Sequence, residues 1–451
     1  MALRTRRWPL IGLLFSVLVG ATGMARAQEP QIQWERPIRV ADPYAWFPDV
    51  VADDAGRVVV LWAGGMRRGR EQYDALFLRM KVGDQWEAPV DIYAGRIIND
   101  ESYAVRNAVL LDPMGQLILA YRHPQTAYVM RAPIEQAESA RAWSEPIRIS
   151  RASAYYVELG QGTDGVLHLI WTEVVPSEAI SDKISCAGCS DVFYRSSADG
   201  GQTWSAPINL SRSPYGSMKP FLWVSSRAPR LYVVWQEGYD SWVGRGSPVG
   251  VGWTRSLDGG RTWEAPRLIT SPVGTPQQPV IGEDGGGQLL MLWRTVEDEA
   301  LYFQRSSDQG ETWSPPQPIP GFRARPWSHP PFDAYDLVAD SAGRLHLAAV
   351  GVRSPEGDLG IFHLMWDGST WWGPFLVWAD GQFPEWPRWA ISEGRRLHLV
   401  WFERDPPHLF DSDNGQYTVW YATALTDAPR VMRTPRPRPT PTAAPTPIRL
   451  E

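Results

Sequence analysis

The chain has little cysteine: Cys186 and Cys189 are the only two in 451 residues. This number excludes a disulfide-rich scaffold, and one Cys-x-x-Cys pair supplies only half of a zinc site. A redox pair is expected at a helix start in a βαβ context, and the sequence around this pair shows no such context. We therefore predict a small loop disulfide, with a redox or metal role as the alternative.

The chain also lacks an excess of basic residues. Its net charge is −6, and no basic stripe is present, so nucleic acid is not an expected partner. No Gly-rich phosphate loop and no Gly-x-Ser-x-Gly elbow stands in a strand–helix context. His168, His346 and His398 each stand in a Leu-His-Leu or equivalent repeat frame, which favours packing over metal ligation. We expect no cofactor and no metal.

A long apolar run is absent after the first 19 residues. Residues 1–27 combine Arg4, Arg6 and Arg7, an apolar stretch and an Ala-x-Ala cleavage site, which together predict a signal peptide. Its removal would take the net charge to about −10. The mature chain is expected to be secreted, periplasmic or on the cell surface, without a membrane span, and monomeric. Sec or Tat export stays open.

Tryptophan and glycine are plentiful, with 24 and 40 residues, and this composition favours an all-β protein with tight hairpins. One eight-residue pattern, Ser-x-Asp-x-Gly-x-Thr-Trp, occurs three times. It predicts a hairpin turn in which Ser and Asp bond the local backbone and Trp covers the turn. The residues that define the three copies are Ser197, Asp199, Gly201, Trp204, Ser256, Asp258, Gly260, Trp263, Ser306, Asp308, Gly310 and Trp313.

This pattern is the Asp box, and the chain resembles the Asp-box (BNR-repeat) superfamily of sialidase-like β-propellers. The resemblance implies a propeller built from small antiparallel sheets. It implies a structural role for the boxes, because the box is a device of the fold and not of the chemistry.

A second pattern, a turn followed by alternating apolar residues that end near an aromatic, occurs seven times at a spacing typical of propeller blades. The copies are 56–62, 115–121, 165–171, 230–235, 287–293, 343–350 and 394–401. The last repeat lacks its final strand, and the segment Trp34 to Val40 has the missing pattern. We predict a seven-bladed propeller of four-stranded antiparallel blades over residues 28–427, closed by the N-terminal strand, with six blades as the alternative.

Residues 428–451 are rich in Pro and Thr and cannot build a core, so they are predicted to form a disordered tail.

Binding residues are expected at the channel mouth, where the loops after the second strand of each blade lie. Equivalent positions of the blades in a closed ring lie around one axis. Charged residues at the C-terminal ends of the second strands should therefore lie together at that mouth. The residues predicted to bind ligand are Trp46, Arg122, Glu173, Glu237, Arg294, Arg388 and Glu403.

Residues in or near the first strand of each blade form a second set of candidate site residues. Their aromatic rings could stack on sugars, and their carboxyls could transfer protons. Its members are Trp46, Asp49, Tyr103, Arg106, Tyr155, Tyr156, Glu158, Tyr215, Lys219, Tyr335, Asp336, Trp386 and Arg388. Structural roles between blades are the alternative for each of them.

The resemblance to sialidases also implies an aromatic-Arg-Ile-Pro motif whose arginine binds a carboxylate. The matching segment here is Ala45-Trp46-Phe47-Pro48, with Trp46 in place of the arginine. Glu237, Asp49 and Tyr335 supply side chains of the types that the family uses for catalysis, but no motif assigns them those roles.

The sequence thus predicts an exported propeller that binds a glycan or another extracellular ligand, including a protein, at the channel mouth without catalysis. A sialidase-like exo-glycoside hydrolase and a scaffold for protein–protein contact are the two alternatives. A pair of carboxyls in the pocket would favour the hydrolase, and an aromatic platform would favour binding.

Overall fold

Antiparallel strands make up nearly all of the regular structure in the computed structural model. The structure describes residues 32–41, 43–97, 106–175, 186, 188–241, 243–295, 297–325, 335–408 and 416–433. The predicted signal peptide, residues 434–451 of the predicted tail and Tyr103 lie outside these ranges. No helix in the described ranges is long and apolar enough to cross a membrane.

Five small antiparallel sheets contain four or five strands each. The first holds β3 (Ala45–Ala52), β4 (Arg57–Arg68), β5 (Glu71–Val82), β6 (Gln85–Trp86) and β7 (Val90–Arg96). The second holds β8 (Asn107–Leu111), β9 (Gln116–Arg122), β10 (Ala127–Pro133) and β11 (Ile147–Arg148), with short 3₁₀ turns at Ile134–Gln136 and Ala140–Ala142. The third holds β12 (Ala154–Gln161), β13 (Leu167–Val174), β14 (Ser190–Ser197) and β15 (Ile208–Asn209).

The fourth small sheet holds β16 (Gly216–Val224), β17 (Leu231–Asp240), β18 (Arg245–Ser256) and β19 (Arg267–Ile269). The fifth holds β28 (Phe383–Ser392), β29 (Arg396–Arg404), β30 (Thr418–Leu425), β1 (Gln33–Trp34) and β2 (Ile38–Ala41), and a 3₁₀ turn at Pro406–His408 follows β29.

The remaining sheet is larger and has eight strands. It holds β20 (Gln277–Glu283), β21 (Leu289–Arg294), β22 (Ala300–Ser306), β23 (Gln317–Ala324), β24 (Asp336–Ala339), β25 (Leu345–Val352), β26 (Gly360–Trp366) and β27 (Trp371–Trp378). Two residue pairs between β23 and β25 join its halves, Arg323 with Val352 and Ala324 with Gly351. The prediction of seven four-stranded blades, with six as the alternative, is therefore corrected: the described strands form five small sheets and one large one.

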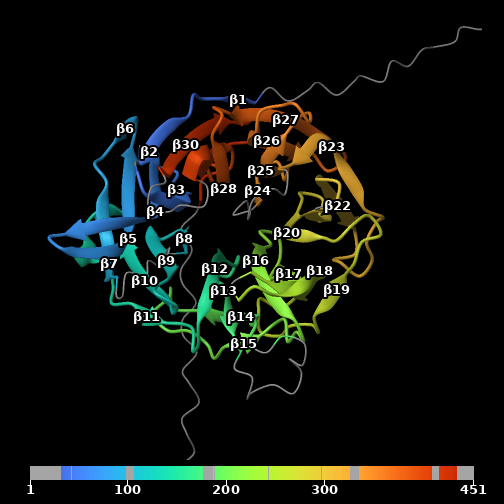
Figure 1. Ribbon diagram of the computed structural model, residues 1–451, viewed down its shortest axis with the longest axis horizontal. Coiled ribbons are helices and arrows are strands. Elements are labelled where there is room, and N and C mark those ends of the chain that lie inside the picture. Colours follow the sequence, from blue (N-terminus) through green and yellow to red (C-terminus); the bar gives the residue numbers. More distant parts are fainter. Residues whose placement is uncertain are drawn as a thin grey trace, which may run out of the picture. The chain divides into compact units, whose positions relative to one another are not determined.

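The sheets are arranged around a common centre as a β-propeller. Figure 1 shows the innermost strands β3, β8, β12, β16, β20, β24 and β28 facing that centre. Each of the seven repeated segments of the sequence lies in the strand that follows an innermost strand, so the predicted internal repeat is confirmed.

The N-terminal strand completes the C-terminal sheet, as predicted. Trp34 pairs with Ala424, and Ile38 pairs with Tyr421, so both β1 and β2 lie against β30. Hydrogen bonds between the two ends of the chain therefore close the ring, and β30 presents no free edge there.

The core lies between neighbouring sheets. One apolar cluster contains Ile118 of β9 and Val129 of β10 together with Leu167 and Trp171 of β13, all of them buried. Alternate residues of each strand point to opposite faces of its sheet, and both faces are covered by neighbours. The second strands are therefore apolar nearly throughout, which explains their strong signal in the sequence.

Candidate functional site

A β-bulge shapes the innermost strands where they face the channel. Phe47, Lys219, Gln278 and Trp386 each have a positive φ, and each is followed by a proline. The strand register shifts at the same place, for instance between Trp46 and Asp49. A bulge redirects the side chains that follow it. Residues just after these bulges, Asp49 and Arg388 among them, line the channel.

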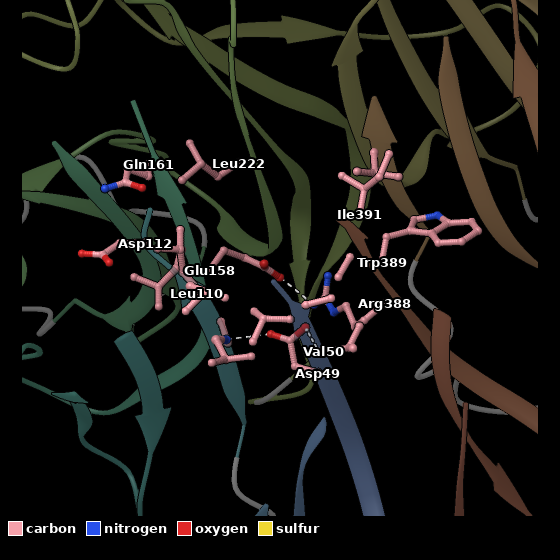
Figure 2. Close-up of a pocket in the computed structure, with 18 of the residues that line it drawn as sticks. Asp49, Val50, Leu110, Asp112, Glu158, Gln161, Leu222, Arg388, Trp389 and Ile391 are labelled. Atoms are coloured by element: carbon pink, nitrogen blue, oxygen red, sulfur yellow. Dashed lines mark hydrogen bonds and ion pairs between the residues drawn. The ribbon is translucent and has the colours of Figure 1, made fainter. Parts of the chain in front are cut away.

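Four charged side chains from four sheets line this level of the channel, and Figure 2 shows three of them, Asp49, Glu158 and Arg388. Arg388 of β28 donates to Glu158 of β12 at 2.6 Å. Asp49 of β3 accepts the backbone N–H groups of Val50 and Val109 at 2.8 and 2.7 Å. Asp336 of β24 likewise accepts those of Leu337 and Trp389 at 2.9 and 2.7 Å. We call Asp49, Glu158, Asp336 and Arg388 the axial cluster.

Burial dominates the electrostatics of the axial cluster. It raises the pKa of Asp49 to about 7, although the Arg388 charge and the Val109 N–H act to lower it. Burial raises the pKa of Asp336 to about 7 against the Arg388 charge and the Trp389 N–H. The pKa of Glu158 is raised by burial too, with Arg388 opposing. Three carboxyls thus share one guanidinium, and some of them take up protons near neutral pH.

A cavity of about 550 Å³ extends from the axial cluster towards the turns that follow the innermost strands. Its walls are partly polar and partly apolar, and Leu110, Leu222 and Ile391 are among the apolar side chains that Figure 2 labels. Asp112 also lines it, but its carboxylate accepts the N–H groups of Met114 and Gln116 and so fixes a turn. We call this space the channel cavity.

A second cavity, of about 30 Å³, lies against the other side of the Glu158–Arg388 pair. Lys219, Tyr335 and Trp386 are among its lining residues. Tyr335 is 1% exposed, which places the predicted catalytic candidate inside the wall of this cavity. The pair Glu158–Arg388 lines both cavities and therefore separates them.

An arginine and aromatic cluster lies beside the small cavity. The guanidinium of Arg106 is 3.4 Å from the ring centre of Phe47 and 4.9 Å from that of Trp386. It also donates to the Tyr155 hydroxyl at 3.0 Å, and the guanidinium of Arg122 lies 4.9 Å from the Tyr155 ring centre. Two cations therefore converge on one phenol, and we call Arg106, Arg122 and Tyr155 the mouth cluster.

The mouth cluster changes the acidity of its phenol. Burial raises the pKa of Tyr155, but the charge and hydrogen bond of Arg106 and the charge of Arg122 outweigh burial and lower it below the ordinary value. Arg122 is predicted from the sequence to bind ligand, and Arg106 and Tyr155 belong to the predicted approach set.

A further arginine network lies nearby and is missed by the sequence prediction. Glu385 accepts from Arg325 at 2.7 Å and from Arg404 at 2.6 Å, and all three side chains are buried. Arg294, a predicted binding residue, donates to the Arg325 carbonyl oxygen at 2.6 Å and is fully buried. Arg294 is thus tied into this network.

The three predicted glutamates share one structural arrangement. Trp171, Trp235 and Trp401 donate their indole N–H to the glutamates two residues later, Glu173, Glu237 and Glu403, at 2.7, 2.6 and 3.1 Å. Residues i and i+2 of a strand share a face, which brings each pair together. All three carboxyls are buried. Their burial and these contacts favour structural roles, and their place at a common mouth and their role in binding stay predictions.

Further contacts fix two of these glutamates. Glu173 accepts the backbone N–H groups of Arg151 and Ala152 at 3.0 and 2.8 Å. Glu237 accepts from the hydroxyls of Ser213 and Ser217. Burial raises the pKa of Glu237 and brings that of Glu403 to about 8. Since Glu237 has partners on both carboxylate oxygens, these contacts favour a structural role over the predicted catalytic one.

Trp46 lies between the sheets. Its ring is 5.4 Å from that of Tyr417, and it packs against apolar clusters on both of its sides. The residue that replaces the family's arginine therefore has a packing environment here. A ligand-binding role for Trp46 stays a prediction.

The Asp boxes have the predicted local geometry. In the first box, Ser197 donates to Asp199 at 2.8 Å and accepts the Gly201 N–H at 2.9 Å, and Thr203 donates its hydroxyl to Asp199 at 2.6 Å. The same three bonds occur around Asp258 and Asp308. These side chains bond within their own turns, as expected for a structural motif.

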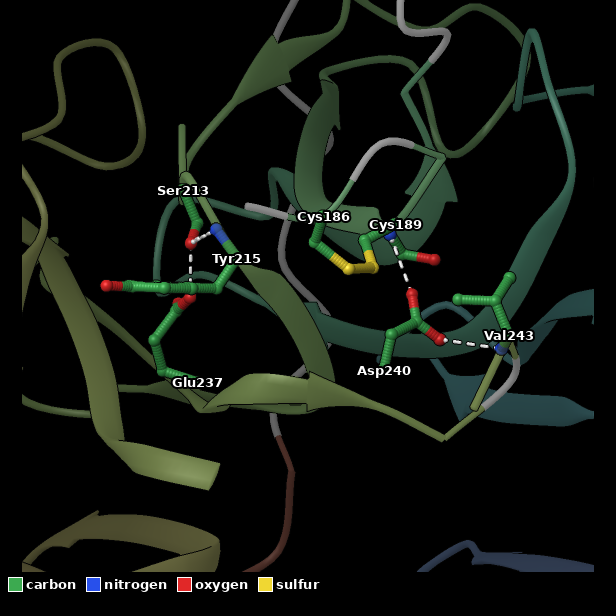
Figure 3. The surroundings of a disulfide bond; sticks show 8 residues. Cys186, Cys189, Ser213, Tyr215, Glu237, Asp240 and Val243 are labelled. Carbon is green, nitrogen blue, oxygen red and sulfur yellow. Dashed lines mark hydrogen bonds between the residues drawn. A yellow bond between two sulfur atoms is a disulfide. The ribbon is translucent and has the colours of Figure 1, made fainter. Parts of the chain in front are cut away.

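Cys186 and Cys189 form a disulfide, with their Cα atoms 5.5 Å apart. Figure 3 shows the disulfide next to Asp240, which accepts the Ser190 N–H at 2.7 Å and the Val243 N–H at 3.2 Å. The disulfide therefore lies beside the β17–β18 hairpin. Within the described ranges, no three His, Cys, Asp or Glu side chains are arranged to hold a metal ion.

Comparison with known families agrees with this architecture. The family of BNR repeat-like domains matches residues 159–418, more than half of the chain. The chain belongs to this family. No curated protein matches it significantly in sequence.

Several solved structures are similar to this BNR repeat-like chain. A protein of unknown function from Dyadobacter fermentans is 14% identical, with a TM-score of 0.50, and 88% of this chain and 100% of that one are covered. An ulvan lyase bound to -[GlcA(1-4)Rha3S]- is 12% identical, with a TM-score of 0.53 and coverages of 85% and 95%. The NanB sialidase of Streptococcus pneumoniae is 12% identical, with a TM-score of 0.46 and coverages of 87% and 70%. At these identities the likeness to the Dyadobacter protein and to the ulvan lyase shows the fold alone.

Proposed function

We propose that this protein is an exported propeller that binds an acidic glycan at the end of the channel where the mouth cluster lies. The observation that carries the proposal is the convergence of Arg106 and Arg122 on Tyr155. Guanidinium groups suit carboxylates, because several N–H donors and a fixed positive charge face the same anion.

Aromatic rings next to these cations support a sugar as the ligand. Tyr155 is half-buried, and Phe47, Tyr156 and Trp386 surround Arg106. Apolar faces combined with a few fixed polar groups are typical of small-ligand sites. The ulvan lyase with the shared fold holds a glucuronate-containing saccharide. That likeness concerns the fold, so the proposal rests on the residues named here.

A glycan-cleaving enzyme is the second candidate, and the lowered pKa of Tyr155 favours it. A phenol that gives up its proton more easily suits proton transfer near neutral pH. Glu158 is paired with Arg388, and Asp49 is bonded to two backbone N–H groups. Tyr155 is therefore a better candidate than Asp49 for the residue that would transfer protons.

The number of blades depends on how the eight-stranded sheet is divided. We propose that its halves, β20–β23 and β24–β27, act as two blades joined at β23–β25. Each half contains one copy of the repeated second strand, β21 or β25, as the other sheets do.

The test is calorimetric titration with 3′-sialyllactose and an oligogalacturonate, with maltohexaose as the neutral saccharide, alongside assays for hydrolysis and for unsaturated lyase products. We expect an acidic saccharide to bind at least about tenfold more tightly than the neutral one, a difference of about 1.4 kcal/mol. Tyr155→Phe, which removes only the hydroxyl, should weaken that binding. Tyr44→Phe, at a tyrosine that is 42% exposed, is the matched control.

The enzyme alternative has its own outcome. If wild-type protein cleaves an acidic saccharide and Tyr155→Phe abolishes turnover while affinity falls little, the enzyme replaces the binding protein. Equal affinity for acidic and neutral saccharides, or none for either acidic one, would contradict both functions as stated.

A further inference from the structure

The first residues of the predicted tail contact the propeller. Val431 donates its N–H to the Glu393 carbonyl at 2.8 Å, and the Arg430 guanidinium bonds the Glu393 carboxylate. Arg433 donates its backbone N–H to Asp54 and its side chain to the Ile391 carbonyl. The chain is therefore held against the propeller up to Arg433, five residues beyond the predicted start of the tail.

Arg433 is also part of the wall of the channel cavity. The chain that continues at Thr434 consequently begins at this cavity. Its next residues, Thr434-Pro435-Arg436-Pro437-Arg438, alternate proline with arginine. Such a sequence favours extended polyproline II conformation, which needs no backbone partners within the segment.

The channel cavity carries more acidic than basic groups. Among the described residues that line it, Asp49, Asp112, Glu158 and Asp336 are acidic, whereas Arg388 and Arg433 are basic. The three carboxyls of the axial cluster lie at its inner end. Two further arginine side chains would balance this charge. The apolar parts of the walls, with Leu110 and Leu222, suit proline rings and arginine stems.

The distances allow the tail to reach the axial cluster. The part of β3 that lines the cavity runs from Asp49 to Ala52, and three residues of strand span about 10 Å. Arg436 is three residues beyond Arg433, which is about 9 Å in polyproline II conformation before the length of its side chain is added. A segment of four or five residues therefore suffices.

We propose that the channel cavity is a binding site for an arginine- and proline-rich peptide, and that residues 434–438 of the same chain occupy it. The segment enters beside Arg433 and places Arg436 or Arg438 near Asp49, Glu158 and Asp336. The site lies on the opposite side of the Glu158–Arg388 pair from the mouth cluster, so the proposal is independent of the proposed glycan site.

Binding should depend on pH and salt in a defined direction. The groups that face the bound arginine are Asp49, Glu158, Asp336, Arg388, Asp112 and Arg433. Because Asp49 and Asp336 lose their protons near pH 7, the affinity should rise between about pH 6 and pH 8. Salt should weaken it by screening.

The test uses protein that ends at Arg433, which retains every described residue, and a synthetic peptide of residues 434–451. We expect saturable binding by calorimetry at pH 8. The matched peptide with Arg436→Gln and Arg438→Gln should bind at least about tenfold more weakly. Equal affinity of the two peptides, or no binding of the first, would overturn the proposal. Thermal melting checks that the shortened protein is folded.

Two variants locate the site. Leu222→Lys places a cation in the wall of the channel cavity and should abolish peptide binding, whereas Leu257→Lys, at an Asp-box position that is 44% exposed, should leave it unchanged. Equal effects of the two substitutions would place the peptide elsewhere and overturn the proposal.

Peptide binding by the full-length chain tests whether the chain's own tail occupies the cavity. If its own tail occupies the cavity, the full chain should bind added peptide at least about tenfold more weakly than the shortened protein, and it should sediment as a monomer. Equal peptide affinity would overturn occupancy by the chain's own tail. A dimer that disappears on removal of residues 434–451 would assign the tail to a second copy and overturn it as well.

Discussion

The Asp boxes precede the outer strands β15, β19 and β23, and we call this region the rim (Figure 1). An aspartate of the rim and an aspartate of the axial cluster have opposite pKa shifts. Burial acts to raise the pKa of Asp258, in the second Asp box, but hydrogen bonds from Thr262 and Ser256 outweigh it and lower the pKa to about 2. At Asp49, in the axial cluster, burial outweighs the Arg388 charge and the Val109 N–H and raises the pKa to about 7. Both side chains accept several hydrogen bonds, so solvent exposure decides the sign.

This difference in pKa indicates that the Asp boxes and the axial cluster have different roles. A rim aspartate keeps its charge across the physiological range, and its bonds to Ser and Thr fix a turn. An axial aspartate changes its charge near neutral pH and lines a cavity. The repeated motif therefore builds the sheets, whereas the side chains that differ from sheet to sheet give the channel its chemistry.

The largest expected effect is that of Arg388→Met. It removes the cation that Glu158, Asp49 and Asp336 share, and loss of one partner of a buried ion pair costs about 3–5 kcal/mol. Chemical denaturation should show this loss at pH 8 and a smaller one at pH 5, where the aspartates hold protons. Adding Glu158→Gln should restore part of the stability at pH 8. Equal losses of unfolding free energy at pH 5 and pH 8 would contradict the claim that Asp49 and Asp336 are protonated at pH 5 and charged at pH 8.

The next effect is the pH dependence of stability caused by Asp49 and Asp336. Their pKa values are raised on folding, so the folded state holds protons that the unfolded state has released. Their contribution to stability is complete below about pH 4 and is lost as the pH rises towards 7. The double variant Asp49→Asn, Asp336→Asn should flatten this part of the curve of unfolding free energy against pH. An unchanged slope would contradict the axial pKa values.

A smaller effect is expected at the rim. Asp258→Ala should cost about 1 kcal/mol through the lost turn hydrogen bonds. Since the pKa of Asp258 is lowered on folding, this contribution is present above about pH 4 and is lost as the pH falls towards 2. Denaturation of the variant at pH 5 and pH 8 should give the same loss. A loss of unfolding free energy that differed between pH 5 and pH 8 would contradict the difference in pKa between Asp258 and the axial aspartates.

The sequence predicts the sheets better than it predicts the site. Three Asp boxes and seven apolar repeats are local patterns, and the missing last strand and the pattern of Trp34 to Val40 complement each other, so closure could be predicted. The bonding of β23 to β25 depends on two residue pairs between distant segments, which no local pattern reveals. The prediction of separate four-stranded sheets throughout was therefore wrong.

Side-chain direction explains the errors at the site. Alternation along β3 does not reveal the register shift between Trp46 and Asp49, and that shift decides which residues line the channel. Asp49, Glu158 and Arg388 could thus be named as strand residues but not as one cluster. The Trp-x-Glu spacing was visible, and because residues i and i+2 share a face of the strand it could have indicated that Glu237 bonds to Trp235.

The most direct test of the division between rim and axis compares Arg122→Gln with Asp199→Ala in one calorimetric titration of an acidic saccharide, either 3′-sialyllactose or the oligogalacturonate. Arg122→Gln removes one cation of the mouth cluster and should weaken binding about tenfold or more, as expected for a lost charged interaction. Asp199→Ala should lower the melting temperature slightly and leave the affinity of the folded protein unchanged. Loss of affinity in Asp199→Ala with unchanged affinity in Arg122→Gln would contradict the account.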